Sequence, residues 1–493
     1  MTTSLREPET NAEAQNPTCG GFRCPLSGKN ATHASWAATP LQDRLAVLRA
    51  ARHHMAAQPE AFAAAISPQL ARTQADTLVS ELLPLLDACK FLEKNAERLL
   101  APRRLGRAGR PFWLSGISAE VHREPLGHIL VIGPANFPLF LPGTQVLQAL
   151  AAGNTVTWKP GSGGGQVAAM MAAALYAAGF PPHALAVTDD TVEAAQAALA
   201  QGADKVVFTG AAGTATDILT KLAATATPAV VELSGADAIV VMPSADLDLV
   251  ARAVAYGLRL NGGAVCMSPR RLFATPETLA ALRPQLLQAL GEVPPVPLSH
   301  RTSDQLRTLV ESAVAEGART LGVFAPEAQS PLLIDHATPH MEITRSDIFA
   351  PVLSLLEVPT LLHLQQAYAA CPYALTASIF CARADEKKAR MLASTLRAGT
   401  VLINDIIAPT ADPRVPFSGR GASGYGATRG AEGLLEMTAV KTLLVRRGGQ
   451  ARHLKPTTNA DVPVFSALIR SAHAGTWRER LRGLRELLSS RNS

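Results

Sequence analysis

The chain has 493 residues, a net charge of +6 and a hydrophobic fraction of 47%, which is enough apolar material for two or three buried cores. No uncharged apolar run reaches the roughly 18 residues of a membrane-spanning helix, and the start MTTSLREPET lacks a signal-peptide core. Six cysteines are too few for a disulfide scaffold, and the pair Cys19 and Cys24 has no histidines nearby to complete a metal site. We therefore expect a soluble cytoplasmic protein without a bound metal.

The positive charge is concentrated at the C-terminus. From residue 446 onward, ten Lys/Arg stand against three Asp/Glu, and this surplus of seven leaves the rest of the chain at −1. The body of the protein has no basic stripe with interleaved aromatic residues. We therefore expect no binding to nucleic acid.

The N-terminal third begins with irregular sequence. Residues 1–32 are rich in Pro, Gly, Asn and Thr, which is typical of a flexible tail. From Leu41 to Leu100, apolar residues recur three and four apart, which predicts helices, with an interruption at Pro68. The alternating segment SAEVHREPLG at 118–127 then predicts an exposed strand or hairpin arm.

The next hundred residues alternate between short apolar strands and helices. The predicted strands are GHILVIG, NTVTWKP, ALAVTD, KVVFTG and PAVVELSG, and the predicted helices cover 141–153, 163–179, 191–202 and 213–226. This alternation predicts a parallel, doubly wound sheet, in which ligands bind at the carboxyl ends of the strands. A second α/β block follows over 236–410, and a glycine-rich segment, PFSGRGASGYGATRG, leads to the strand-like KTLLVRR.

Four side chains in this pattern are suited to chemistry. Cys266 follows Asn261-Gly262-Gly263 and precedes two arginines, a setting that favours a thiolate nucleophile. Glu232 at a predicted strand end is a candidate general base, Asn136 in a strand-to-helix loop is a candidate oxyanion donor, and Lys159 can reach a ribose or phosphate. Each alone also fits a plain structural role, but together at the strand ends of one sheet they favour an active site.

The usual dinucleotide fingerprint GxGxxG is missing from the first strand-to-helix turn. The loop FTGAAGT at 208–214 is only a loose relative of a phosphate cradle. A turn of small residues that allows tight packing explains this loop equally well.

Across about residues 35–447, the sequence resembles the aldehyde dehydrogenase superfamily, in particular its shorter, class-3-like members. Cys266 follows Glu232 by 34 residues, close to the family's spacing. The stretches that carry the resemblance, in the family's order, are EPLGHILVIGPANFPLFL, ALAAGNTVTWKP, VVFTGAAG, VELSGADAIVV, ADLD, NGGAVCMSPRR, DIFAPV, LRAGTVLIND and PFSGRGASGYG.

The resemblance implies an α/β fold with a Rossmann-like doubly wound cofactor domain, an α/β catalytic domain and a small oligomerisation arm. The expected divisions are a tail at 1–32, helices and the cofactor domain at 33–235, the catalytic domain at 236–410, a return segment with a bridging strand at 411–447, and a basic extension at 448–493.

The resemblance also implies a reaction and its residues. An aldehyde is oxidised to a carboxylic acid with NAD or NADP, with Cys266 as nucleophile, Glu232 as the base that activates water and Asn136 as oxyanion donor. Small residues before Cys266 are expected to let cofactor and aldehyde approach the sulfur. The residues expected to bind the cofactor are Pro134, Lys159, Ser162, Phe208, Thr209, Gly210, Ala211, Asp347 and Phe349.

Several positions depart from the family's pattern and keep alternatives open. The departures are Ala135 for tryptophan, Ala264 for glutamine, Ser234 for glycine, Ala211 and Ala215 for serine and glycine, Asp347 for glutamate and Ala350 for glycine. One alternative is a non-catalytic relative used for assembly or binding. Another is an acylating reductase that acts on a thioester or acyl phosphate, although such an enzyme has no need of the base Glu232. Ser162 stands where many NAD-preferring members have a glutamate, which favours use of NADP.

The last segment, GTWRERLRGLRELLSS, predicts an amphipathic helix. Trp477, Leu481, Leu484 and Leu488 are spaced four, three and four apart, so they form one apolar stripe flanked by arginines. Such a helix either lies weakly on an anionic membrane or packs on the protein's own body or a second subunit. The resemblance also implies a homodimer.

Overall fold

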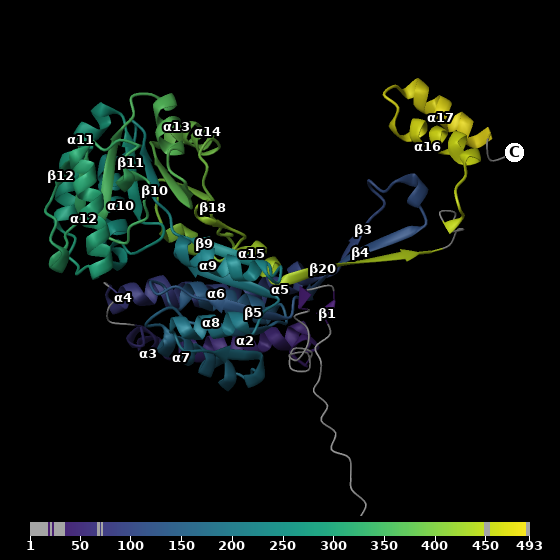
Figure 1. Ribbon diagram of the computed structural model, residues 1–493, viewed down its shortest axis with the longest axis horizontal. Helices are drawn as coiled ribbons and strands as arrows, with labels where there is room; N and C mark the ends of the chain where they lie inside the picture. The colour runs from purple at the N-terminus through teal and green to yellow at the C-terminus, as the bar shows by residue number, and fades with distance from the viewer. Residues whose placement is uncertain are drawn as a thin grey trace, which may run out of the picture. The chain divides into compact units, whose positions relative to one another are not determined.

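The computed structural model describes residues 18–19, 22–23, 35–66, 70, 72–447 and 454–489 (Figure 1). Most of the predicted tail over 1–32, Cys24, the interruption at Pro68 and residues 448–453 lie outside this range, and the tail contributes only the paired strands β1 (Thr18–Cys19) and β2 (Phe22–Arg23). The chain divides into two compact units, one of Met1–Pro102 with His122–Lys441 and one of Arg103–Val121 with Thr442–Ser493. The finer division predicted within the first unit stays a prediction.

The first unit begins with the predicted helical layer. It contains α2 (Leu41–Ala56), α3 (Pro59–Ala64), α4 (Gln74–Thr77), the π-helical turn η1 (Leu78–Leu82) and α5 (Leu83–Leu100). Thr73 and Asp76 form a capping box that starts α4. The π-turn joins α4 to α5 without a break, and Pro84 is the second residue of α5.

The first α/β block forms a six-stranded sheet in the order β19-β9-β8-β5-β6-β7. The pairs among β5, β6, β7, β8 and β9 are parallel, while β19 joins β9 in antiparallel orientation. The strands are β5 (His128–Ile132), β6 (Thr155–Lys159), β7 (Leu185–Val187), β8 (Lys205–Gly210), β9 (Ala229–Leu233) and β19 (Gly424–Tyr425).

Helices cover both faces of this sheet. Because successive side chains of a strand point to opposite faces, a strand such as β5 contributes to the core on each side. Ile129 and Val131 of β5 pack into a core shared with α6 (Phe140–Ala151) and α7 (Gly165–Ala177). Leu130 and Ile132 belong to a separate core shared with α8 (Val192–Ala200) and α9 (Ala212–Ala223). The predicted doubly wound α/β fold is therefore confirmed.

The second α/β block forms a seven-stranded sheet in the order β12-β13-β14-β11-β10-β16-β17, parallel except for β12. Its strands are β10 (Asp237–Val241), β11 (Pro269–Ala274), β12 (Arg319–Leu321), β13 (Leu332–Asp335), β14 (Val352–Glu357), β16 (Thr376–Phe380) and β17 (Thr400–Ile403). The helices around it are α10 (Leu247–Arg259), α11 (Pro276–Gly291), α12 (His300–Ala315), α13 (Leu361–Ala369) and α14 (Glu386–Ala393).

Short elements close the first unit. Strands β15 (Tyr373–Ala374) and β18 (Arg420–Gly421) pair in antiparallel orientation, and helix α15 (Gly430–Glu436) follows the glycine-rich segment. This segment leads into β20 (Thr438–Arg446), which forms a three-stranded sheet in the order β20-β4-β3 with β4 (Ile117–Pro125) and β3 (Arg103–Leu105). The strand predicted at 118–127 is thus β4, but its residues are half-buried rather than exposed, with Glu124 as the exception.

Two helices, α16 (Val462–His473) and α17 (Trp477–Ser489), pack against each other in the second unit. Gly483 permits their close approach, because a Cβ there would lie 2.5 Å from the backbone nitrogen of Ser471. The predicted stripe lies on α17, where its four side chains are 40–68% exposed. Within the described residues, no helix is both long enough and apolar enough to cross a lipid bilayer.

Candidate active site

A groove of about 280 Å³ lies at the carboxyl ends of β5, β6 and β8. It contains seven of the nine residues predicted to bind a cofactor, which are Pro134, Lys159, Ser162, Phe208, Thr209, Gly210 and Ala211. Helices α8 and α9 supply the far wall through Val192, Gln196, Thr214 and Lys221. The strand-end position of these residues follows directly from the parallel order of the sheet.

The groove is shaped by backbone that approaches closely. A Cβ on Gly161 would lie 2.1 Å from the carbonyl oxygen of Pro134, and one on Gly210 would lie 2.6 Å from the ring of Phe208. Helix α9 begins at the groove with Ala211 at its N-cap and no side chain bonded to its first amides. Backbone N–H groups are thus free for a phosphate. The glycines and the helix start fit a dinucleotide, although the fingerprint sequence is absent.

Lys159 ends β6 and is buried in the groove wall. Burial lowers the pKa of its ammonium group, and the nearby Asp190 carboxylate acts in the opposite direction. Asp190 also accepts a hydrogen bond from the backbone N–H of Gly163 at 2.7 Å, which fixes the turn that carries Ser162.

The other two predicted cofactor residues lie elsewhere. Asp347 and Phe349 are in the loop before β14 and are not among the residues that line the groove. The carbonyl oxygen of Asp347 accepts a hydrogen bond from Gln305, and the Phe349 side chain is 38% exposed.

Cys266 and Glu232 line a second pocket of about 120 Å³. Its walls are mostly apolar and come from Val79, Phe137, Phe140, Leu141, Leu260, Met267 and Ile407. Its other polar members include Asp76, Ser80, Tyr256, Thr410 and Arg429. The pocket thus combines a thiol, a carboxyl group and a guanidinium within an apolar enclosure.

The loop before Cys266 has an unusual backbone. Asn261, Gly262 and Gly263 all have positive φ values, of 53°, 60° and 75°. A Cβ on Gly263 would lie 2.8 Å from the carbonyl oxygen of Ala350, so only glycine allows this packing. The small residues of this loop are predicted to let ligands approach the sulfur. The backbone conformation at Gly263 gives a second reason for glycine at this position.

Burial raises the pKa of the Cys266 thiol, and the carboxyl groups of Glu232 and Asp237 raise it further. The Arg429 guanidinium and the backbone N–H of Met267 act in the opposite direction. The sulfur is consequently a neutral thiol at rest, and its nucleophilic form depends on nearby positive charge.

Glu232 lies on β9 with only 3% of its surface exposed. The Thr428 hydroxyl donates to its Oε2 at 3.2 Å, while Oε1 has no hydrogen-bond partner among the described residues. Burial raises the pKa of this carboxyl group, and the Arg429 charge and the Thr428 hydrogen bond oppose that rise. One carboxylate oxygen is therefore available to accept a proton in the pocket.

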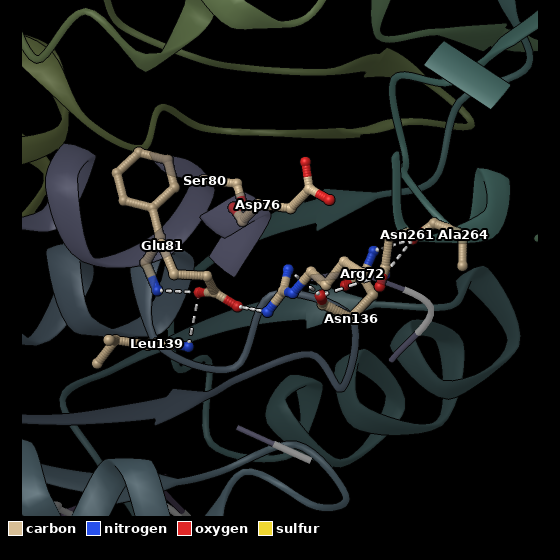
Figure 2. A network of polar contacts seen from close by, with 9 residues as sticks. Arg72, Asp76, Ser80, Glu81, Asn136, Leu139, Asn261 and Ala264 are labelled. Atoms are coloured by element: carbon tan, nitrogen blue, oxygen red, sulfur yellow. Dashed lines mark hydrogen bonds and ion pairs between the residues drawn. The ribbon is translucent and has the colours of Figure 1, made fainter. Parts of the chain in front are cut away.

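Asn136 is linked to the cysteine loop rather than exposed in the pocket lining (Figure 2). Its Nδ2 donates to the carbonyl oxygen of Ala264 at 3.0 Å, and Nδ2 of Asn261 donates to the same oxygen at 3.1 Å. One N–H of the Asn136 amide is thus engaged by the carbonyl oxygen two residues before Cys266, and the role of Asn136 as an oxyanion donor stays a prediction.

A buried ion pair supports the Asn136 loop from behind (Figure 2). Glu81 pairs with Arg72 and accepts from the backbone N–H groups of Leu139 and Phe140 at the start of α6. Arg72 also donates to the carbonyl oxygen of Asn136 at 3.3 Å. This network joins the first helical layer to the loop that carries the candidate oxyanion donor.

Sequence reasoning did not select Arg72, Glu81, Thr428 or Arg429. All four are at least partly buried around the site, but charged residues in a sequence usually indicate solvated surface. The available signal was the position of Thr428 and Arg429 in the glycine-rich segment, where two charged or polar side chains follow a run of small residues.

Comparison with known proteins identifies relatives of this chain. The profile described as the Aldehyde dehydrogenase family matches residues 27–443. A 4,4'-diapolycopene aldehyde oxidase from a Methylomonas species is 28% identical over 416 residues, which cover 82% of this chain and 77% of that relative.

Two solved structures share the fold. A betaine aldehyde dehydrogenase point mutant from Staphylococcus aureus, in complex with NAD+, gives a TM-score of 0.80 at 20% identity and covers 88% of this chain and 91% of that one. An NADP-dependent glyceraldehyde-3-phosphate dehydrogenase from Bacillus halodurans, complexed with NADP, gives a TM-score of 0.77 at 26% identity. The match covers 85% of this chain and 89% of that one.

Proposed function

Because the chain belongs to the aldehyde dehydrogenase family, we propose that it oxidises an aldehyde to a carboxylic acid with NAD or NADP, through a thioester on Cys266. The observation that carries this proposal is the pocket in which Cys266 and Glu232 lie together behind apolar walls. A nucleophile and a base in one water-poor pocket are what formation and hydrolysis of a thioester require.

The reaction begins when Cys266 releases its thiol proton to solvent and the thiolate attacks the aldehyde carbon to form a carbon–sulfur bond. The side-chain N–H of Asn136 and the backbone N–H of Cys266 stabilise the oxyanion that develops. A bound nicotinamide cofactor would supply the acceptor for the hydride that leaves this carbon. Glu232 then takes a proton from water, the water oxygen attacks the thioester, and the carbon–sulfur bond breaks to give the acid and free Cys266.

The groove at the strand ends supplies the binding site for NAD or NADP. We expect Lys159 and Ser162 to bind the adenine ribose and the start of α9 to bind the pyrophosphate, and their shared position in one groove supports this assignment. We assign use of NADP to Ser162, because a serine hydroxyl can donate to a 2′-phosphate that a carboxylate would repel. The solved structures with NAD+ and with NADP support either dinucleotide as cofactor.

Glu232 favours this oxidative reaction over an acylating reductase. An enzyme that passes the acyl group to a thiol or phosphate does not activate water, so it has no use for a buried base beside the nucleophile. Retention of Cys266, Glu232, Asn136 and Lys159 likewise favours catalysis over a non-catalytic role in assembly.

The test is turnover by the purified protein. Aldehydes that vary in chain length and aromaticity are offered with NAD and with NADP, and reduced nicotinamide is followed by absorbance, with cofactor binding measured by calorimetry. We expect acid formation with at least one cofactor. An absence of turnover across the panel together with an absence of cofactor binding would leave the non-catalytic role standing.

We also propose a cytoplasmic homodimer that contacts anionic membranes weakly through α17. The exposed stripe on α17 and the neighbouring Arg478, Arg482 and Arg485 support this contact. Full-length protein is expected to co-sediment with anionic vesicles at low salt, whereas a truncated protein that ends at Gly449 is not, and rising salt weakens the binding. Equal behaviour of the two proteins would instead favour packing or assembly as the role of the helix, and light scattering reports the oligomeric state.

A further inference from the structure

Arg429 has an unusual backbone and an unusual environment. Its φ of 64° and ψ of 173° place it in a region that glycine adopts and other residues rarely do. Its side chain is also only 3% exposed, although a guanidinium is costly to remove from water. Retaining an arginine against both penalties indicates that its side chain has a task in the pocket.

Hydrogen bonds explain only part of this placement. Nη1 donates to the carbonyl oxygen of Thr410 at 2.6 Å, and the guanidinium lies 4.3 Å from the ring centroid of Phe417 and 5.4 Å from that of Phe140. Nε and Nη2 have no hydrogen-bond partner among the described residues. The rings hold the group in place without neutralising it, so its charge stays available to the pocket.

Thr428 contacts the Glu232 carboxylate, and its neighbour Arg429 lines the same pocket. Backbone hydrogen bonds of 2.8 Å in both directions between Thr428 and Phe417 fix the segment. From there, Thr428 donates to Glu232, and Arg429 lines the pocket that contains Glu232 and Cys266. Consecutive residues thus act on one base, the first through a hydrogen bond and the second through its charge.

We propose that Arg429 is a positioning residue that favours the ionised form of Glu232 for attack of water on the thioester, while Thr428 fixes the direction of the carboxylate. This inference rests on the proposed function of Cys266 and Glu232. In an apolar pocket an isolated carboxyl group is protonated and cannot accept a proton from water. A buried cation nearby lowers the pKa of that carboxyl group and so favours its charged form, although burial is the larger influence on Glu232.

Few other charged groups act on this cluster. On Glu232, the influences are burial, the Arg429 charge and the Thr428 hydrogen bond. On Cys266, the carboxyl groups are those of Glu232 from β9 and Asp237 from β10, and the cations are Arg429 and Arg270 of β11. The pocket lining also contains the carboxyl group of Asp76, which is paired with Arg259. Replacement of Arg429 by an uncharged residue therefore raises the pKa of Glu232 and moves the acid limb of the hydrolysis rate to higher pH.

The experiment follows hydrolysis of the acyl enzyme without a cofactor. With p-nitrophenyl acetate, attack by Cys266 releases p-nitrophenolate in a burst and leaves an acetyl thioester. Water then attacks the thioester, Glu232 takes the proton, and acetate leaves as the sulfur is freed and reprotonated. The steady rate after the burst reports this second step, and its pH profile is compared for wild type, Arg429→Met and Arg429→Lys.

We expect Arg429→Met to retain a burst while the acid limb of the steady rate moves up by about one pH unit or more, because an opposite charge nearby shifts a carboxyl pKa by roughly 1–3 units. Arg429→Lys should stay near wild type, since it retains the charge. The control is Arg283→Met, which removes an ion pair with Asp335 outside the pocket and should leave the limb in place.

An acid limb that is unchanged in Arg429→Met would overturn the inference and favour Arg429 as a binding group for a negatively charged substrate, since acetate esters carry no such group. An Arg429→Met protein that does not fold is replaced by Arg429→Gln with the same readout. Absence of the burst in wild type, or its survival in Cys266→Ala, would instead count against the proposed nucleophile and so against the proposed function.

Discussion

The cofactor groove and the reaction pocket lie in one unit but are built in different ways. The groove is formed by backbone at strand ends, with Gly161 and Gly210 where side chains would collide. The pocket is formed by ionisable side chains that are buried against apolar walls. Substitutions such as Ala211 are therefore expected to be tolerable in the groove, because our proposal assigns the binding there to main-chain atoms. In the pocket each charge sets the ionisation of its neighbours, so a single change affects several groups.

Replacement of the nucleophile gives the largest expected effect and tests whether the two regions are independent. Cys266→Ala should lower kcat by about a thousandfold or more, because no thioester forms. Cofactor affinity, measured by calorimetry, should stay near wild type because Cys266 does not line the groove. Substantial dehydrogenase turnover by this variant would contradict the nucleophile assignment.

Replacement of the base separates the two halves of the reaction. Glu232→Gln keeps the size of the side chain but cannot accept the proton from water, so steady-state turnover should fall by about a hundredfold. Rapid mixing should still show a burst of one reduced cofactor per site. A loss of the burst as large as the loss of turnover would indicate that Glu232 also acts before the thioester forms.

Disruption of the buried ion pair between Arg72 and Glu81 should have a smaller effect on kcat/KM. Arg72→Met leaves the buried Glu81 without its partner and frees the Asn136 loop, and a small misplacement of such a loop costs about tenfold to a hundredfold in kcat/KM. In the background of Asn136→Ala the same change should cost much less, although the melting temperature should fall in both. Fully additive losses in kcat/KM would show that Arg72 does not act through Asn136.

A substitution in the groove should have the smallest effect, a change in cofactor preference. Ser162→Glu introduces a carboxylate where the 2′-phosphate of NADP is expected, and the ratio of kcat/KM for NADP to that for NAD should fall about tenfold, near 1.4 kcal/mol. Wild type serves as the reference, and a preference for NAD above about a hundredfold in wild type would already contradict the proposed role of Ser162.

The sequence predicted the regular parts of this molecule well, because strands and amphipathic helices carry a period. The strand ends at Glu232, Lys159 and Phe208 followed from that pattern and lie as expected. Buried charges have no such signature, so Glu81 and Arg429 were not selected. Their role depends on tertiary contacts between segments far apart in the chain. The assignments of Asp347 and Phe349 rested on resemblance alone and stay predictions.

Strand β19 affects the order in which a newly synthesised chain acquires the parts of its candidate active site. It pairs Gly424 with Glu232, and Thr428, 196 residues after the carboxylate it contacts, arrives with it. At a synthesis rate of roughly 5–20 residues per second, Cys266 and Glu232 have both been synthesised about 8–32 s before Thr428 is added to the chain. Until then the base lacks its hydrogen bond and its nearby cation. The site is therefore completed only after Ile407, Thr410 and Arg429, which line the pocket of Cys266, have been added to the chain.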